Sequence, residues 1–341
     1  MSFPPWPRRA RAAATLVLAA AACLPEAVPS WLLTAPRLVV IEQSVVATGP
    51  LSPPLDADPP GVRRRDGLPG DRLRLAAFFA GPDGPVAPVD PPIWVRSRRT
   101  FVYHPGAEPI PPCADDGRDD LLDCVIAGDT LTLPPVPEGG FDGRNENLVF
   151  VFASTSTELS AADCLDFYLR GGEGERFDCH YGRERLAYGP YYVVEELAGE
   201  EVVAPEIEPD RFAEGLRFDL VFRGPAGERA RLAARGDVVV MRPDETLTIG
   251  LVAAAEDFQV IDPAPSPDER REMLLATFFA SAPVLPDSAA YEVYELGPID
   301  APSDDGAFIY AIVRESGRGS RSASLQWFYI QLVLGDPEAP P

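Results

Sequence analysis

Short runs in which hydrophobic and polar residues alternate recur along the chain and predict β-strands. In the run from Arg72 to Phe79, apolar residues occupy positions 73, 75, 77 and 79, and the run begins with arginines at positions 72 and 74. A period of two is that of a strand with one buried face. Comparable runs predict further strands at 37–46, 93–95, 130–133, 148–152, 191–195, 216–222, 246–249, 272–279, 291–296 and 308–313.

Helical periodicity is scarce, and one short helix is expected. Ser160 followed by Asp163 forms a capping box that predicts a helix running to about Leu169 and carrying Cys164. The 39 prolines and 28 glycines favour turns over long helices. The predicted fold class is therefore all-β, with tandem immunoglobulin-like β-sandwiches and a short helical, disulfide-bearing insertion.

A repeated phrase predicts two related domains. Pro69–Leu75 and Pro243–Ile249 both run from a turn through an acidic residue into strict alternation, 174 positions apart. Downstream of each phrase comes a long apolar strand, at Leu148–Phe152 and at Phe308–Val313. The expected domains are a first β-sandwich at 37–200, with the disulfide-bearing insertion, and a second at 201–341. Residues 201–242 could instead be the remnant of a third domain.

The amino terminus has the three parts of an export signal. Three arginines within the first eleven residues precede an apolar stretch, and small residues lead into Cys23. Residues 1–22 are therefore interpreted as a signal peptide, with Cys23 acylated as in a lipoprotein and 23–36 forming a lipidated tether. Ala20-Ala21-Ala22 also fits an ordinary cleavage site, so simple secretion is the alternative.

The cysteine count supports acylation of Cys23. The chain has five cysteines, an odd number for an exported protein. If Cys23 carries lipid, the other four can pair, and the simplest of three connectivities joins Cys113 to Cys124 and Cys164 to Cys179. A zinc site is not favoured because the chain lacks Cys-x-x-Cys spacing and clustered histidines.

Charge and composition narrow the functional classes. The formal net charge is −23, which opposes binding to nucleic acid. With only two histidines, His104 and His180, and none of the common nucleophile or nucleotide-binding motifs, the chain is not expected to be an enzyme or to use a cofactor. An enzyme of unrecognised type, built on paired carboxylates, is the remaining catalytic alternative.

Three further groups of residues could bind a ligand, and each has a simpler interpretation. Carboxylates between Cys113 and Cys124 could hold calcium, although their spacing is not that of an EF-hand, and a solvated acidic loop is favoured. Trp94, Trp327 and Tyr329 could stack on sugars, but strand alternation favours core packing. The arginines at 63–65 are expected to be solvated. The calcium candidates are Asp115, Asp116, Asp119, Asp120 and Asp123.

Several phrases resemble known bacterial proteins. The final predicted hairpin, Phe308–Leu334, resembles that of bacterial immunoglobulin-like domains, including the PKD-like kind. The whole chain resembles a group of uncharacterised myxobacterial-type lipoproteins. The resemblance implies a sandwich fold and a cell-envelope location; it implies no activity. The export signal, the repeated sandwich pattern and the missing catalytic motifs favour a non-catalytic binding or structural module, tethered to a membrane through the lipid anchor, with an envelope protein or glycan as partner. The phrases that carry it are Cys23-Leu24-Pro25, Pro69–Leu75, Arg270-Arg271-Glu272 with Phe278-Phe279, and Arg314–Gly319.

Overall fold

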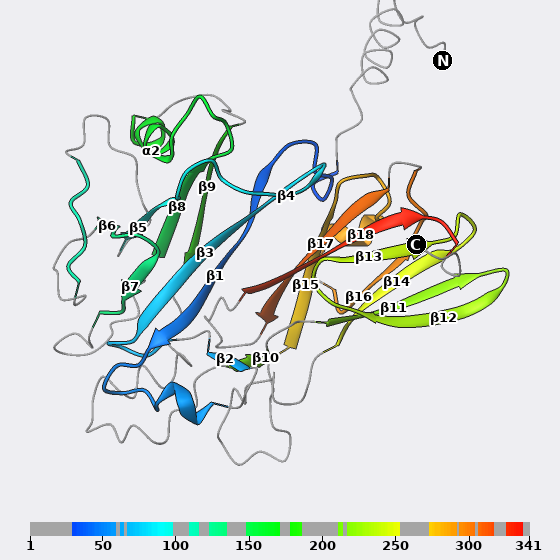
Figure 1. Ribbon diagram of the computed structural model, residues 1–341, viewed down its shortest axis with the longest axis horizontal. Helices are drawn as coiled ribbons and strands as arrows, with labels where there is room; N and C mark the ends of the chain where they lie inside the picture. The colour runs from blue at the N-terminus through cyan, green and yellow to red at the C-terminus, as the bar shows by residue number, and fades with distance from the viewer. Residues whose placement is uncertain are drawn as a thin grey trace, which may run out of the picture. The chain divides into compact units, whose positions relative to one another are not determined.

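In the residues that it describes, the computed structural model is an all-β fold with one short α-helix and two disulfides (Figure 1). All statements below concern the described residues. None of the helices within them is long and apolar enough to cross a lipid bilayer. The described residues are 29–58, 62–64, 67–97, 109–115, 123–134, 148–170, 178–185, 211–213, 217–252, 273–291, 293–303, 306–316 and 325–336.

The first sandwich combines two four-stranded sheets. In one sheet β3 lies between β1 and β7 and also pairs with β4; in the other the order is β6-β5-β8-β9, and all pairs are antiparallel. The helix α2 (Ala161–Leu169) connects β8 to β9. The strands are β1 (Arg37–Ala47), β3 (Arg72–Gly81), β4 (Gly84–Val86), β5 (Ile93–Ser97), β6 (Asp123–Ile126), β7 (Thr130–Thr132), β8 (Leu148–Ser154) and β9 (Cys179–Arg185).

The second sandwich has the sheet orders β12-β11-β14-β16 and β13-β18-β17-β15. Its one parallel pair joins β13 to the last strand, β18. The strands are β11 (Arg217–Gly224), β12 (Gly227–Ala233), β13 (Asp237–Met241), β14 (Thr246–Val252), β15 (Met273–Ala280), β16 (Glu295–Ile299), β17 (Ala307–Ser316) and β18 (Leu325–Leu334). A small separate sheet pairs β2 (Val62–Arg64) with β10 (Arg211–Ala213), and the 3-10 turns η1 (Leu55–Ala57) and η4 (Asp287–Ala290) complete the described elements.

The repeated phrases of the sequence occupy equivalent places in the two sandwiches. β3 lies between β1 and β7, as β14 lies between β11 and β16. The long apolar strands β8 and β17 are likewise central, between β5 and β9 and between β15 and β18. Equivalent strands therefore follow each other in the same order in both halves.

Each sandwich has its own apolar core, and a third cluster lies between the sandwiches. In the first core Trp94 packs with Leu73 and Val149, and in the second core Phe218 packs with Phe328. Burial of each such side chain stabilises the fold by roughly 1.5–3 kcal/mol. The third cluster, here called the seam, comprises Leu33, Val39, Val40, Ala80, Tyr310, Ile312 and Trp327.

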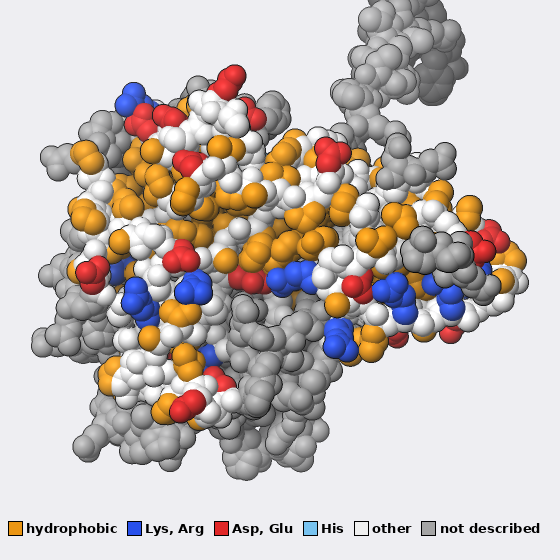
Figure 2. Space-filling model, viewed as in Figure 1, with side chains coloured by type: hydrophobic (Ala, Val, Ile, Leu, Met, Phe, Trp, Pro, Cys, Tyr) orange, Lys and Arg blue, Asp and Glu red, His pale blue; other side chains and the backbone are white. Residues whose placement is uncertain are grey.

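The seam joins β1 and β3 of the first sandwich to β17 and β18 of the second. The Tyr310 hydroxyl donates to the Gly81 carbonyl at 3.2 Å, and the rings of Phe78 and Trp327 lie 4.6 Å apart. Burial raises the pKa of the Tyr310 hydroxyl. Hydrophobic side chains gather across the centre of this face in Figure 2. Contacts between the sandwiches therefore combine apolar packing with polar bonds: besides the Tyr310 bond, the Glu42 carboxylate of β1 accepts from the Trp327 backbone N–H at 3.2 Å and from Arg235 at 3.3 Å.

The structure bears on three points of the expected organisation. Residues 217–241 are no separate domain, because β11 pairs with β14 and β13 pairs with β18 inside the second sandwich. The strand expected at 291–296 is shifted, since β16 runs from Glu295 to Ile299. The end of the expected tether is packed, because Trp31 and Leu33 are 6% and 1% exposed. The strand expected at 191–195 lies outside the described residues.

Candidate functional site: the disulfide-linked helix and the Tyr168–Tyr181 pair

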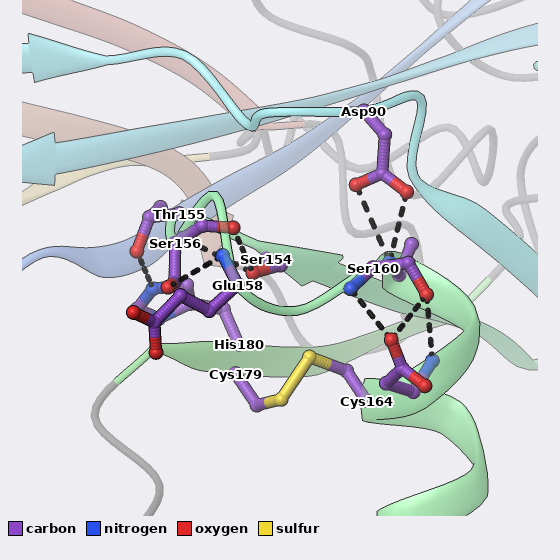
Figure 3. The surroundings of a disulfide bond; sticks show 11 residues. Asp90, Ser154, Thr155, Ser156, Glu158, Ser160, Cys164, Cys179 and His180 are labelled. Atoms are coloured by element: carbon purple, nitrogen blue, oxygen red, sulfur yellow. Dashed lines mark hydrogen bonds between the residues drawn. A yellow bond between two sulfur atoms is a disulfide. The ribbon is translucent and has the colours of Figure 1, made fainter.

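At the start of helix α2, three side-chain oxygen acceptors bind backbone N–H groups that have no carbonyl partner within the helix. The Ser160 hydroxyl accepts from the Asp163 N–H at 3.1 Å, and the Asp163 carboxylate accepts from the Ser160 N–H at 2.8 Å. The Asp90 carboxylate, from the loop before β5, accepts from the Ala161 N–H at 3.0 Å (Figure 3). Two carboxylates at this end also complement the helix dipole. The capping box expected from the sequence is confirmed.

A disulfide then holds the helix against the sheet. Cys164, in the second turn of α2, is bonded to Cys179, the first residue of β9 (Figure 3). Cys164 is 3% exposed, so the bond lies inside the contact between helix and sheet. The local pairing expected for these cysteines is the one the structure contains. It places one residue of α2 at a constant distance from the edge strand β9.

This arrangement brings three aromatic rings into one column. Phe152 of β8 is fully buried, and its ring centroid lies 5.2 Å from that of Tyr168 on α2. Tyr168 in turn lies 5.0 Å from Tyr181 of β9, which is 63% exposed. Burial raises the pKa of the Tyr168 hydroxyl, and the neighbouring Tyr181 raises it further. The column runs from the apolar interior to the surface, so it presents two tyrosines on a rigid base.

The tyrosine pair is the part of this site that sequence reasoning missed. The alternation of β9 is short, and Tyr181 stands in it between His180 and Gly182. A Cβ on Gly182 would collide with Leu38 of β1, so glycine allows β9 to approach the other sheet closely. Neighbouring residues of a strand face opposite sides of the sheet, so His180 and Gly182 lie toward the other sheet and Tyr181 faces outward to α2. Only the pairing of β9 with β8 reveals this orientation.

His180 makes a structural contact beside the disulfide. Its Nε2 lies 2.8 Å from the Thr155 hydroxyl, and its ring lies 5.6 Å from that of Phe79 on the opposite sheet. The side chain is buried, and burial lowers its pKa, although the nearby Asp178 carboxylate acts in the opposite direction. A neutral imidazole hydrogen-bonded to a hydroxyl could in principle activate a nucleophile. Here both groups link β9 to the end of β8. The other histidine, His104, lies outside the described residues.

The second disulfide pins the acidic segment that was considered for calcium. Cys113 and Cys124 are bonded, and the Cys113 N–H donates to the Val125 carbonyl at 2.8 Å, which adds a bridge to the edge of β6. Of the calcium candidates, Asp115 is exposed, whereas Asp123 accepts a 2.6 Å hydrogen bond from the Ser97 hydroxyl. Asp116, Asp119 and Asp120 lie outside the described residues. The described residues contain no group of three side chains able to hold a metal ion.

A cavity of about 290 Å³ lies beside this disulfide. It is open to solvent, and the Thr132 hydroxyl at its wall donates to the Asp115 carbonyl at 2.8 Å. Its lining includes two exposed charged side chains but none that is deeply buried, so its chemistry is that of ordinary surface. The lining residues include Arg72, Cys113, Asp115, Ile126, Thr130 and Thr132.

The remaining candidates have structural positions. Trp94 and Trp327 are 2% and 5% exposed and Tyr329 is half-buried, so the interpretation as core packing is correct for the two tryptophans. The expectation of solvated arginines is wrong for Arg64, which is 2% exposed. Its guanidinium donates to the Pro53 carbonyl at 2.8 Å and to Asp58 at 2.9 Å, holding the loop around η1.

Cys23 lies outside the described residues, so its acylation stays a prediction. The best-formed candidate surface of the described chain is the one made by Tyr168 and Tyr181 beside the Cys164–Cys179 bond.

Comparisons of the chain with models of protein families, with curated proteins and with solved structures gave no match.

Proposed function

We propose that this protein is a membrane-tethered lipoprotein of the cell envelope, anchored through Cys23, that acts as a non-catalytic binding or structural module. In this proposal the two sandwiches are tandem immunoglobulin-like domains of the kind found in the lipoproteins that the sequence resembles. The partner is an envelope protein or a glycan. A high negative charge on the chain disfavours nucleic acid as a partner.

The observation that carries the proposal is the pair of disulfides in the first sandwich. Each bond closes a short loop, with sequence separations of 11 and 15 residues. Disulfides persist in oxidising compartments, which agrees with the export signal expected at residues 1–22. They also leave Cys23 as the single cysteine of the five without a disulfide partner, free to take the acyl group of a lipoprotein.

The intact, unreduced mass of the protein from its native envelope fraction tests the anchor. The expected mass is that of residues 23–341 with acyl groups, less four hydrogens for the two disulfides. An unlipidated mass beginning after residue 22 would replace the lipoprotein with a secreted protein that has a Cys23 thiol. Retention of residues 1–22 would contradict export processing altogether.

A carbohydrate is the second candidate for what the module binds, and the tyrosine pair favours it. Aromatic rings stack on the apolar faces of sugars, and tyrosine combines a ring with a hydroxyl that can hydrogen-bond. Tyr181 and Tyr168 are held by the helix cap and the disulfide, so little conformational entropy is lost when a ligand binds. The exposed Arg183, two positions along β9, would add a hydrogen-bond donor at the same surface.

Binding of the intact protein to cell-wall and capsular polysaccharides tests this second candidate. Tyr181→Ala should lower the affinity at least about tenfold, since removal of a stacked aromatic costs more than 1 kcal/mol at a binding hot spot. The matched control is Tyr291→Ala, which removes a 71% exposed tyrosine of the second sandwich. Equal affinities for the wild-type protein and the Tyr181 variant would exclude the tyrosine pair as the sugar site.

A further inference from the structure

Three residues that precede the first sandwich in the chain are bound to the second sandwich. The Leu33 N–H donates to the Ala280 carbonyl at 2.8 Å, and the Ala280 N–H donates to the Trp31 carbonyl at 3.0 Å. These bonds make a parallel bridge between Leu32 and Ala280, the last residue of β15. Residues 31–33, here called the strap, thus extend the outer edge of the sheet β13-β18-β17-β15.

The side chains of the strap enter two different apolar clusters. Trp31 is 6% exposed and belongs to the core of the second sandwich, together with Ala280 and Phe278. Leu33 is 1% exposed and belongs to the seam. Four positions after Leu33, the Arg37 guanidinium lies 4.9 Å from the ring centroid of Phe279 on β15. Both backbone and side chains therefore hold this segment to the end of β15.

We propose that the strap fastens the tether from Cys23 to the fold, so that the second sandwich, and not the first, is held next to the membrane. This inference rests on the lipid anchor proposed above. Seven residues separate Cys23 from Trp31, which limits the tether to about 25 Å when fully extended. Without the strap, the tether would run to Arg37 with thirteen residues and reach about 45 Å.

The strap also determines where a pull on the anchor enters the molecule. Tension from the membrane reaches Trp31 and the end of β15 before it reaches β1. The first sandwich, with its two disulfides and its tyrosine pair, is therefore loaded only through the seam while the strap is bound. Its tyrosine pair lies on α2 and β9, which the strap does not bond, so the attachment of the anchor is separate from this surface.

Native-state hydrogen exchange tests the strap in the protein itself. The amides of Leu33 and Ala280 should exchange at least about a hundredfold more slowly than unstructured amides. Trp31→Ala should abolish protection at both amides. Trp94→Ala removes a tryptophan from the first core and should leave both protected. Leu33→Pro removes the N–H donor without altering the second core, and should expose Ala280. Unprotected Leu33 and Ala280 amides in the wild-type protein would overturn the proposal.

Energy transfer on vesicles tests the position of the second sandwich. A donor dye at the exposed position Pro283, placed by Pro283→Cys and close to Ala280, would report distance to an acceptor in the headgroups of phosphatidylethanolamine–phosphatidylglycerol vesicles. Addition of Leu33→Pro should lower the transfer efficiency, because the tether lengthens. If Leu33→Pro removes the amide protection of Ala280 but leaves the energy-transfer efficiency unchanged, the membrane-proximal position of the second sandwich would be overturned. Protein without acyl groups would instead overturn the Cys23 anchor, and hydrogen exchange would still decide whether the strap forms.

Discussion

Asp71 and Glu245 occupy equivalent positions in the two sandwiches and make the same backbone contact. Each stands directly before the central strand of its sheet, at the acidic position of the repeated phrase. The Asp71 carboxylate accepts from the N–H of Leu68 at 2.7 Å, and the Glu245 carboxylate accepts from the N–H of Arg242 at 3.0 Å. In both cases the acceptor lies three residues after the donor, so the carboxylate closes the turn that leads into the strand.

Their other partners differ. Asp71 is fully buried and also accepts from the Gly49 N–H and the Ser52 hydroxyl, both at 2.6 Å. Glu245 is paired with Arg229 through two hydrogen bonds, of 2.9 and 2.7 Å. The hydrogen bond from Arg229 holds the pKa of the Glu245 carboxyl below its usual value. The repeated phrase therefore encodes a turn closed by a carboxylate. The other hydrogen bonds of that carboxylate go to different partners in the two sandwiches.

Asp71→Ala should destabilise the protein strongly. The substitution leaves three donors without their acceptor, and each buried unsatisfied donor costs about 1–3 kcal/mol. We expect the free energy of unfolding to fall by about 3 kcal/mol, measured by urea denaturation. Asp129→Ala is the matched control, because the Asp129 carboxylate is 57% exposed and lies 3.8 Å from Arg74. A similar fall in the free energy of unfolding of both variants would show that the buried contacts of Asp71 stabilise the protein no more than an exposed carboxylate does.

Arg229→Lys should destabilise the second sandwich although the charge is kept. The Arg229 guanidinium makes the paired bonds to Glu245, donates to the Val240 carbonyl at 2.8 Å and lies 3.6 Å from the Phe222 ring centroid. An ammonium group cannot reproduce this planar set of contacts, so we expect a loss of about 2 kcal/mol. Arg223→Lys is the control; this exposed arginine pairs with Glu228, and a change within about 0.5 kcal/mol is expected.

Thermal or urea unfolding of both arginine variants would measure the difference. Equal stabilities of the two variants would mean that the Arg229 contacts are no stronger than an exposed ion pair. Loss at Arg229 alone would show that its contacts stabilise the second sandwich. Arg229 and Arg231 also donate to carbonyl groups of the edge strand β13, Arg229 to that of Val240 at 2.8 Å and Arg231 to that of Val238 at 3.5 Å. Occupied edge carbonyls are less available for pairing with another chain.

Stability should fall as the pH drops below the ordinary pKa of histidine, because of His180. Burial lowers the pKa of this imidazole in the folded state from its usual 6.5. Between the two values the unfolded chain binds a proton that the folded protein does not, so acidification favours unfolding. The contribution of His180 is fully present above pH 6.5 and is lost progressively below it.

Urea denaturation between pH 7.5 and 5.5 would measure this effect in the wild-type protein and in His180→Gln. The variant keeps a polar group near Thr155 but cannot titrate, so its stability should depend less on pH in this range. Carboxylates contribute to both curves, and the difference between the curves isolates the imidazole. Parallel curves for the two proteins would contradict a depressed pKa at His180.

Removal of the Cys164–Cys179 bond should loosen helix α2 selectively. In the chain-entropy model a closed loop of fifteen residues contributes about 3 kcal/mol, and we expect Cys164→Ala with Cys179→Ala to lose about that amount. Amides of α2 should exchange faster in the double variant than in the wild-type protein. Amides of β17 in the second sandwich should remain the more protected of the two groups. Dithiothreitol should destabilise the wild-type protein more than the double variant, which retains only the other disulfide. Unchanged exchange in α2 would show that its cap and apolar face suffice.

Local patterns of the sequence predicted most of the elements correctly. Strict alternation located β3, β11 and β14, and the Ser160–Asp163 phrase located α2, because both signals depend on residues close in the chain. The weaker alternation of β9 and of the arginine-rich β12 gave no comparable signal. The cysteine spacing suggested both disulfides for the same local reason. By itself the sequence thus determined the all-β class, the helix α2 and the repeated phrase before β3 and β14.

The tertiary structure decided what depends on residues far apart in the chain. No local pattern shows that Trp31 enters the core of the second sandwich, that Arg64 is buried against Pro53, or that Tyr181 meets Tyr168 at the surface. Such contacts depend on which strands pair and which faces meet, and burial then follows from the free energy of the whole arrangement. Residues alike in sequence, such as Asp71 and Glu245, therefore share a turn while their long-range partners differ.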